Sequence, residues 1–80
     1  MVSVESIKRI IEEKLKHNIA SEDEILTNVG ADSVTLVEIV VELEKKFEVE
    51  FSDQFLNKLL RISINDIVNE IGKMKDNYFS

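Results

Sequence analysis

Apolar residues recur near the start of the chain with the period of an α-helix, and charged residues fill the positions between them. The stripe consists of Val4, Ile7, Ile11 and Leu15, with Ile10 at its edge. Side chains at this spacing share one face, so the pattern predicts an amphipathic helix. Ser3 can cap its start, and Val2 and Ile7 can form a hydrophobic staple across the cap. The pattern breaks near His17.

A loop is expected from about residue 17 to residue 31. Within it, Ser21 and Glu24 have capping-box spacing, which predicts a single helical turn. We expect the apolar residues of this loop to fold back over the core; they are Ile25, Leu26 and Val29. A loop of this length inside a compact domain usually has a packing or functional reason.

The second helical pattern runs from about Ser33 to Lys46 and is more apolar than the first. Its main face carries Leu36, Ile39, Val40, Leu43 and Phe47. A second apolar row, rotated away from the first, consists of Val34, Val37 and Val41. Valine lowers helix propensity only slightly, and the helical period persists to the polar end at Lys45 and Lys46, so we interpret the segment as a helix rather than a strand.

Two further helices are expected after the alternating segment 47–51, which predicts an extended connector. Ser52 or Asp53 can cap a short third helix that carries Phe55, Leu56, Leu59 and Leu60. Ser63 and Asp66 have capping-box spacing at the start of the last helix, and Ile62 and Ile67 can staple it. We expect this helix to fray from Lys75 onward. The predicted fold is an all-α bundle of three main helices plus one short helix, in a single domain over residues 1–80.

Composition narrows the classes of function. The chain has 80 residues, 44% of them apolar and 32% charged, with a net charge of −6 and no cysteine. The negative charge disfavours nucleic-acid binding and favours partners with basic surfaces. We see neither a signal peptide nor an apolar run long enough for a membrane span, and we expect a cytoplasmic monomer.

No constellation of catalytic or metal-binding residues stands out. The sequence lacks a phosphate-binding glycine loop and the ligand pattern of a calcium hand. His17 has no evident nucleophile beside it, and most carboxylates fall on solvated faces. We therefore expect no catalytic residue and no metal site.

Ser33 can be interpreted in two ways. Serine is among the best residues at a helix N-cap, which gives Ser33 a purely structural role. It can also be a site of covalent attachment, because a phosphate at a helix N-terminus meets unpaired N–H groups and the positive end of the helix dipole. Gly30 adds backbone freedom just upstream. The Asp32-Ser33 pair alone leaves both interpretations open.

The wider context resembles the signature of acyl carrier proteins. The matching segments are Gly30-Ala31-Asp32-Ser33-Val34 and the helix Val37-Glu38-Ile39-Val40-Val41-Glu42-Leu43-Glu44-Lys45-Lys46-Phe47. The first helix, around Ile7, and the last, from Ile64 to Ile71, also resemble those of the family. The resemblance implies an acyl-carrier domain in which Ser33 carries phosphopantetheine, transferred from coenzyme A by a magnesium-dependent transferase. Acyl groups would be held on the arm as thioesters, and the chain itself would not be an enzyme.

The same resemblance implies a set of partners and a surface that they contact. The partners are the phosphopantetheinyl transferase and acyl-transfer, ketosynthase or adenylating enzymes with basic docking surfaces. We predict partner contacts at Asp32, Val34, Val37, Glu38, Val41 and Glu44. The valines could instead pack under the long loop or the third helix, but the main face of the helix already suffices for the core.

The chain departs from the family pattern at several positions. Val34 replaces the usual leucine, Thr35 stands where an acid is common, and Lys45 and Lys46 replace acids. These differences fit a carrier for polyketide, peptide or specialised lipid assembly at least as well as one for fatty acids. The alternative function is an interaction or structural subunit with a carrier-like fold and no functional arm.

Overall fold

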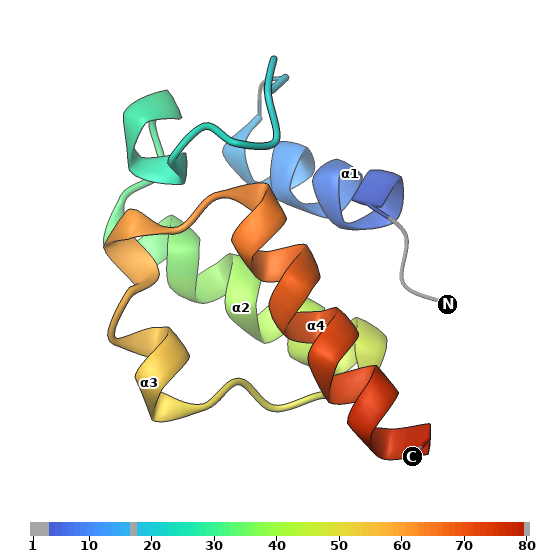
Figure 1. The fold of residues 1–80 in the computed structure, drawn as a ribbon. Coiled ribbons are helices and arrows are strands. Elements are labelled where there is room, and N and C mark those ends of the chain that lie inside the picture. The colour runs from blue at the N-terminus through green and yellow to red at the C-terminus, as the bar shows by residue number, and fades with distance from the viewer. Residues whose placement is uncertain (1–3, 17, 80) are drawn as a thin grey trace.

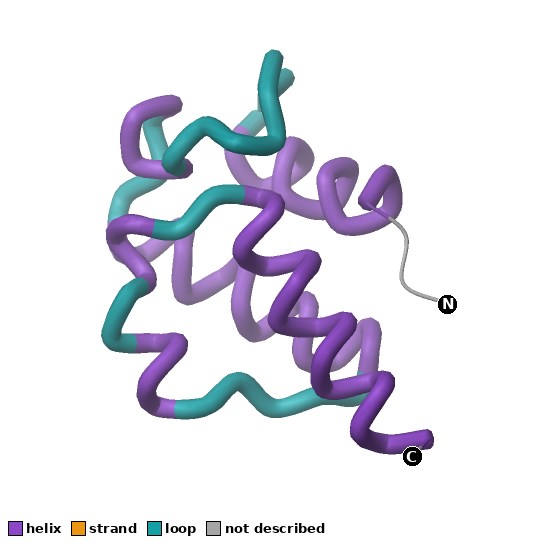
Figure 2. Tube along the Cα trace, viewed as in Figure 1, coloured by secondary structure: helices purple, strands orange, loops and turns teal. Residues whose placement is uncertain are grey.

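The predicted helical stripes pack against one another in the computed structural model of the chain, which describes residues 4–16 and 18–79, with side chains through residue 75 (Figure 1). The long helices are α1 (Val4–Leu15), α2 (Ser33–Phe47) and α4 (Ile64–Phe79). The short helix α3 (Asp53–Leu56) and two 3-10 helices, η1 (Leu26–Val29) and η2 (Leu59–Arg61), lie in the connections. Figure 2 shows helices and loops but no strand in this part of the chain, which confirms the all-α class. The predicted cap at Ser3, its staple partner Val2 and His17 lie outside the described residues.

The core is mostly aliphatic, with Phe51 and Phe55 also buried in it, and it includes the stripes of the three long helices. Helix α1 contacts both α2 and α4. The fully buried side chains are Ile7, Ile11, Leu26, Leu36, Ile39, Leu43, Ile64, Ile67 and Ile71. Removing this apolar surface from water is the main force that holds so short a chain together, since it contains no disulfide.

Side-chain caps set the starts of the later helices, as the sequence predicts. The Ser52 hydroxyl accepts a hydrogen bond from the Phe55 N–H at 3.2 Å, so Ser52 rather than Asp53 caps α3. At α4, the Ser63 N–H donates to the Asp66 carboxylate at 3.0 Å, and the Asp66 N–H donates to the Ser63 hydroxyl at 3.2 Å. This reciprocal pair is the predicted capping box. Helix α4 continues past Lys75 to Phe79. The fraying expected from Lys75 onward stays a prediction.

The long loop has more structure than expected. Ser21 to Glu24 forms one hydrogen-bonded turn that is not helical, and the helical turn lies further on, at η1. The Leu26 N–H donates to the Ile62 carbonyl at 2.9 Å, and the Thr27 hydroxyl donates to the Leu60 carbonyl at 3.1 Å. These bonds fasten η1 to η2 and so hold the segment that leads into α2.

Candidate functional site

The approach to α2 is a tight turn that depends on glycine. Gly30 has a φ of 104°, in the left-handed region that L side chains rarely adopt, and it ends η1. The next residue, Ala31, is buried, and its N–H donates to the Leu26 carbonyl at 3.1 Å. The chain therefore passes from the buried Ala31 to the surface at Asp32 and Ser33.

Asp32, not Ser33, caps helix α2. The Asp32 carboxylate accepts a hydrogen bond from the Thr35 N–H at 2.8 Å, and Ser33 is the first residue of the helix. The structural interpretation of Ser33 as an N-cap is therefore wrong. The Ser33 side chain is exposed, and within the described part of the chain its hydroxyl has no hydrogen-bond partner. It is an accessible hydroxyl at the positive end of a helix dipole, which suits a phosphodiester.

The capping bond also tunes the charge of Asp32. The Thr35 N–H holds the pKa of the Asp32 carboxyl below its ordinary value of 3.8. A hydrogen bond to the charged form has this sign, because it favours ionisation. Asp32 therefore stays ionised at neutral pH beside the Ser33 hydroxyl.

We expect Asp32→Ala to lower the melting temperature, because the Thr35 N–H loses its acceptor. Asp32→Asn should keep part of the cap without the charge. Since the folded-state pKa is depressed, the contribution of the charge is full above pH 3.8 and is lost as pH falls through the lower folded-state value. Thermal unfolding at neutral and acidic pH measures this. Equal melting temperatures for the wild type and Asp32→Ala at neutral pH contradict the assignment of the cap.

An exposed row of valines extends from the Ser33 end of α2. We call Val34, Val37 and Val41 the valine row; their exposed fractions are 69%, 52% and 42%. The alternative that they pack under the loop or the third helix is therefore wrong. Among the described residues, the exposed large apolar side chains outside this row are Val4, Leu56 and Leu60. Leu60 lies in η2, which contacts both η1 and α2, and it is not among the predicted site residues.

The two acids predicted beside the valine row differ in their surroundings. Glu38 is exposed. Glu44 is only partly exposed, and its carboxylate accepts a hydrogen bond from the Phe51 N–H at 3.0 Å. Glu44 thus holds the connector after α2 in place, a role that its position in the sequence did not indicate. Its contact with partners stays a prediction.

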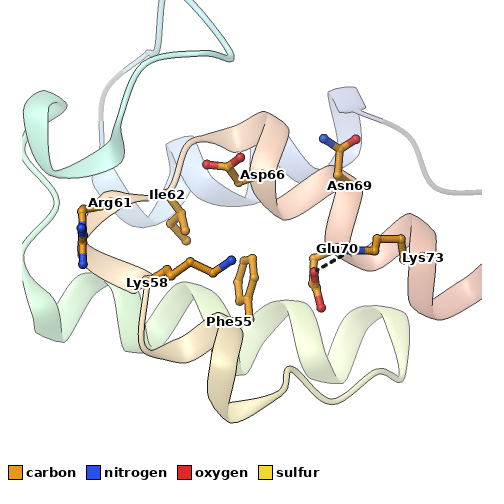
Figure 3. Close-up of a pocket in the computed structure, with 8 residues that line it drawn as sticks. All are labelled: Phe55, Lys58, Arg61, Ile62, Asp66, Asn69, Glu70 and Lys73. Atoms are coloured by element: carbon orange, nitrogen blue, oxygen red, sulfur yellow. Dashed lines mark ion pairs between the residues drawn. The ribbon is translucent and has the colours of Figure 1, made fainter.

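A groove elsewhere on the molecule is lined mostly by polar and charged side chains, unlike the valine row. It is lined by residues of the segment from α3 to η2 and of helix α4, Phe55 and Ile62 among them (Figure 3). Its volume is about 380 Å³. Its acids already have partners, because Asp66 accepts from the Ser63 N–H and Glu70 pairs with Lys73. Ser33 and the valine row do not line it.

The described residues contain no cluster of metal-binding side chains. None of their helices has the length and apolar character needed to span a membrane.

Comparison with known proteins gives one consistent result. The family model described as "Phosphopantetheine attachment site" matches residues 5–71. The acyl carrier protein of Campylobacter jejuni subsp. doylei is 36% identical over 78 residues, covering 94% of this chain and 99% of that protein. The acyl carrier protein of Campylobacter fetus subsp. fetus is 40% identical, covering 94% of this chain and 99% of that protein. The acyl carrier protein of Campylobacter concisus is 39% identical, covering 92% of this chain and 97% of that protein. No solved structure matches the chain.

The matched residues include the turn at Gly30, the whole of α2 and the start of α4 as far as Ile71. The similarity therefore covers both the helical bundle and the exposed end of α2. The chain belongs to the acyl carrier protein family, whose members carry phosphopantetheine and are carriers rather than enzymes.

Proposed function

We propose that Ser33 bears the phosphopantetheine arm and that the chain holds acyl groups on it as thioesters during fatty-acid, polyketide or specialised lipid or peptide biosynthesis. In the attachment step, the Ser33 oxygen bonds to the pantetheine phosphate of coenzyme A. The phosphoanhydride bond from that phosphate to the nucleotide breaks, the nucleotide leaves with its own phosphate, and the hydroxyl proton passes to solvent. The observation that carries the proposal is that Asp32 takes over the cap and leaves the Ser33 hydroxyl exposed.

The arm supplies a group that the chain lacks. A thioester needs a thiol, and the sequence contains no cysteine. The fit of the site to the arm rests on the exposed hydroxyl at the start of α2, where a phosphate is favoured by the helix dipole. The acyl chemistry then belongs to the partner enzymes, and this chain positions and presents the arm.

We also propose that the partner enzymes dock on the valine row. An exposed apolar strip of this kind marks an interaction site, and here it begins one residue after the attachment point. Glu38 supplies a negative charge beside it, which favours partners with a cation at the matching position. Asp32 extends the acidic rim toward the arm.

A thiol assay tests the attachment directly. Purified protein is incubated with coenzyme A, magnesium and a broad-specificity phosphopantetheinyl transferase, and then freed of small molecules. We expect one reactive thiol per chain and a mass gain of one phosphopantetheine. The unmodified chain has no cysteine, so the background is zero. A chain that stays folded and acquires no thiol from any competent transferase contradicts the proposal.

A further inference from the structure

Two opposite charges lie on the face of α2 that carries the valine row. Positions 34, 38, 41 and 45 recur at the spacing that keeps side chains on one face of a helix. They are Val34, Glu38, Val41 and Lys45, and all four are exposed. The face therefore carries a carboxylate in the half next to Ser33 and an ammonium group in the half next to Phe47.

Neither charge forms an ion pair with another of the described residues. The ion pairs among the described residues join Lys8 to Glu22 and Lys73 to Glu70, and neither Glu38 nor Lys45 takes part in them. Glu44, the acid next to Lys45 in sequence, is committed to the Phe51 N–H. Both Glu38 and Lys45 are therefore available to a partner.

The separation of the two charges makes them distinct features. Seven residues of α-helix advance the chain by about 10 Å. This exceeds the distance of about 8 Å over which salt screens exposed charges at physiological ionic strength. A docking partner therefore meets the Glu38 carboxylate and the Lys45 ammonium group as two separate charges.

We infer, on the basis of the docking proposed above, that the partner presents a carboxylate to Lys45 as well as a cation to Glu38. A uniformly basic surface would place a cation against Lys45, and repulsion between like charges disfavours that contact. The partner is thus an acyl-handling enzyme whose docking surface carries both signs around an apolar patch. Lys45 fixes the direction in which that surface lies along α2.

The chain offers a matched control at the next position. Lys45 and Lys46 both lie in the last turn of α2, where either cation stabilises the negative end of the helix dipole. Each residue turns the helix by about 100°, so Lys46 lies away from the valine row. Lys46→Glu therefore reproduces the effects of Lys45→Glu on net charge and on the helix dipole without changing the docking face.

The test uses the arm-bearing full chain and the enzyme that acylates its thiol, purified from the source cells by following thioester formation by intact mass. We expect Lys45→Glu to raise the KM of that enzyme for the carrier about fivefold, with kcat unchanged, because one attraction becomes a repulsion. Lys46→Glu should leave KM unchanged. Glu38→Lys should also raise KM, although it changes the net charge in the opposite direction. Thermal unfolding of each variant checks that the fold is intact.

A KM that falls or stays constant in Lys45→Glu overturns the inference, and a fall identifies a uniformly basic partner. An equal rise of KM in Lys45→Glu and Lys46→Glu also overturns it, because the effect then follows net charge rather than position.

The variant Val41→Asp separates failure of this inference from failure of the proposed docking. If Val41→Asp raises KM and Lys45→Glu does not, the proposed docking on the valine row is supported. The inference that the partner presents both a cation and a carboxylate is then wrong. If Val41→Asp has no effect, the docking face is wrong, and the inference fails with it.

Discussion

Ser33→Ala is expected to abolish arm attachment completely while leaving the bundle folded. The substitution removes the only atom through which a phosphodiester can form at this position. The cap of α2 survives, because the Asp32 carboxylate and the Thr35 N–H form it. An exposed substitution of this kind changes the free energy of unfolding by about 0.5 kcal/mol or less. Intact mass after incubation with coenzyme A and transferase measures the first effect, and thermal unfolding measures the second.

Ser21→Ala is the matched control for this experiment. Ser21 is an exposed serine in the loop before η1, outside the proposed site. We expect this variant to acquire the arm as the wild type does. If Ser33→Ala still acquires an arm, attachment is elsewhere. If it unfolds, Ser33 has a structural role that the hydrogen bonds at the start of α2 do not show.

Leu26→Ala should cause a large loss of stability. Leu26 is fully buried in η1, and its N–H and carbonyl bond to Ile62 and Ala31. Truncating a fully buried leucine to alanine costs about 2–5 kcal/mol, because apolar contacts are lost and a cavity remains. Domains are stable by only about 5–15 kcal/mol, so the loss is a large part of the total. Urea unfolding measures the difference in the free energy of unfolding.

Leu60→Ala provides the comparison in the neighbouring 3-10 helix. Leu60 is 57% exposed, so the same truncation removes little buried surface. We expect its free energy of unfolding to change by about 0.5 kcal/mol or less. A similar loss in Leu26→Ala and Leu60→Ala would show that η1 does not anchor the turn into α2 in the manner described.

The sequence predicts most of the bundle because its signals are local. The stripe that includes Ile7 and Ile11 marks α1, and the Ser63–Asp66 pair marks the start of α4. Both depend on residues within one or two turns of each other, where helical geometry leaves little freedom. The exposed valine row is predictable for a related reason, since the buried face of α2 already has enough apolar residues.

The cap of α2 and the contacts between distant segments cannot be predicted from a local sequence pattern. Asp32 and Ser33 are both good N-cap residues. A shift of the helix start by one residue decides whether the Asp32 carboxylate or the Ser33 hydroxyl accepts the hydrogen bond from the backbone N–H. The bond from Phe51 to Glu44 and the contacts between η1 and η2 depend on how distant segments meet. The cap at Asp32 and the contacts between η1 and η2 matter for the site, because the first leaves the Ser33 hydroxyl exposed and the second hold the segment before Gly30 in place.

The most direct test of the account is to locate the arm by fragmentation mass spectrometry of the modified chain. Trypsin cleavage after Lys16 and Lys45 releases peptide 17–45, which contains two serines, Ser21 and Ser33. Fragment ions from between these serines distinguish them. We predict one phosphopantetheine per chain, on Ser33. An arm on Ser21, or on any other peptide of the chain, would contradict the assignment of Ser33 as its site.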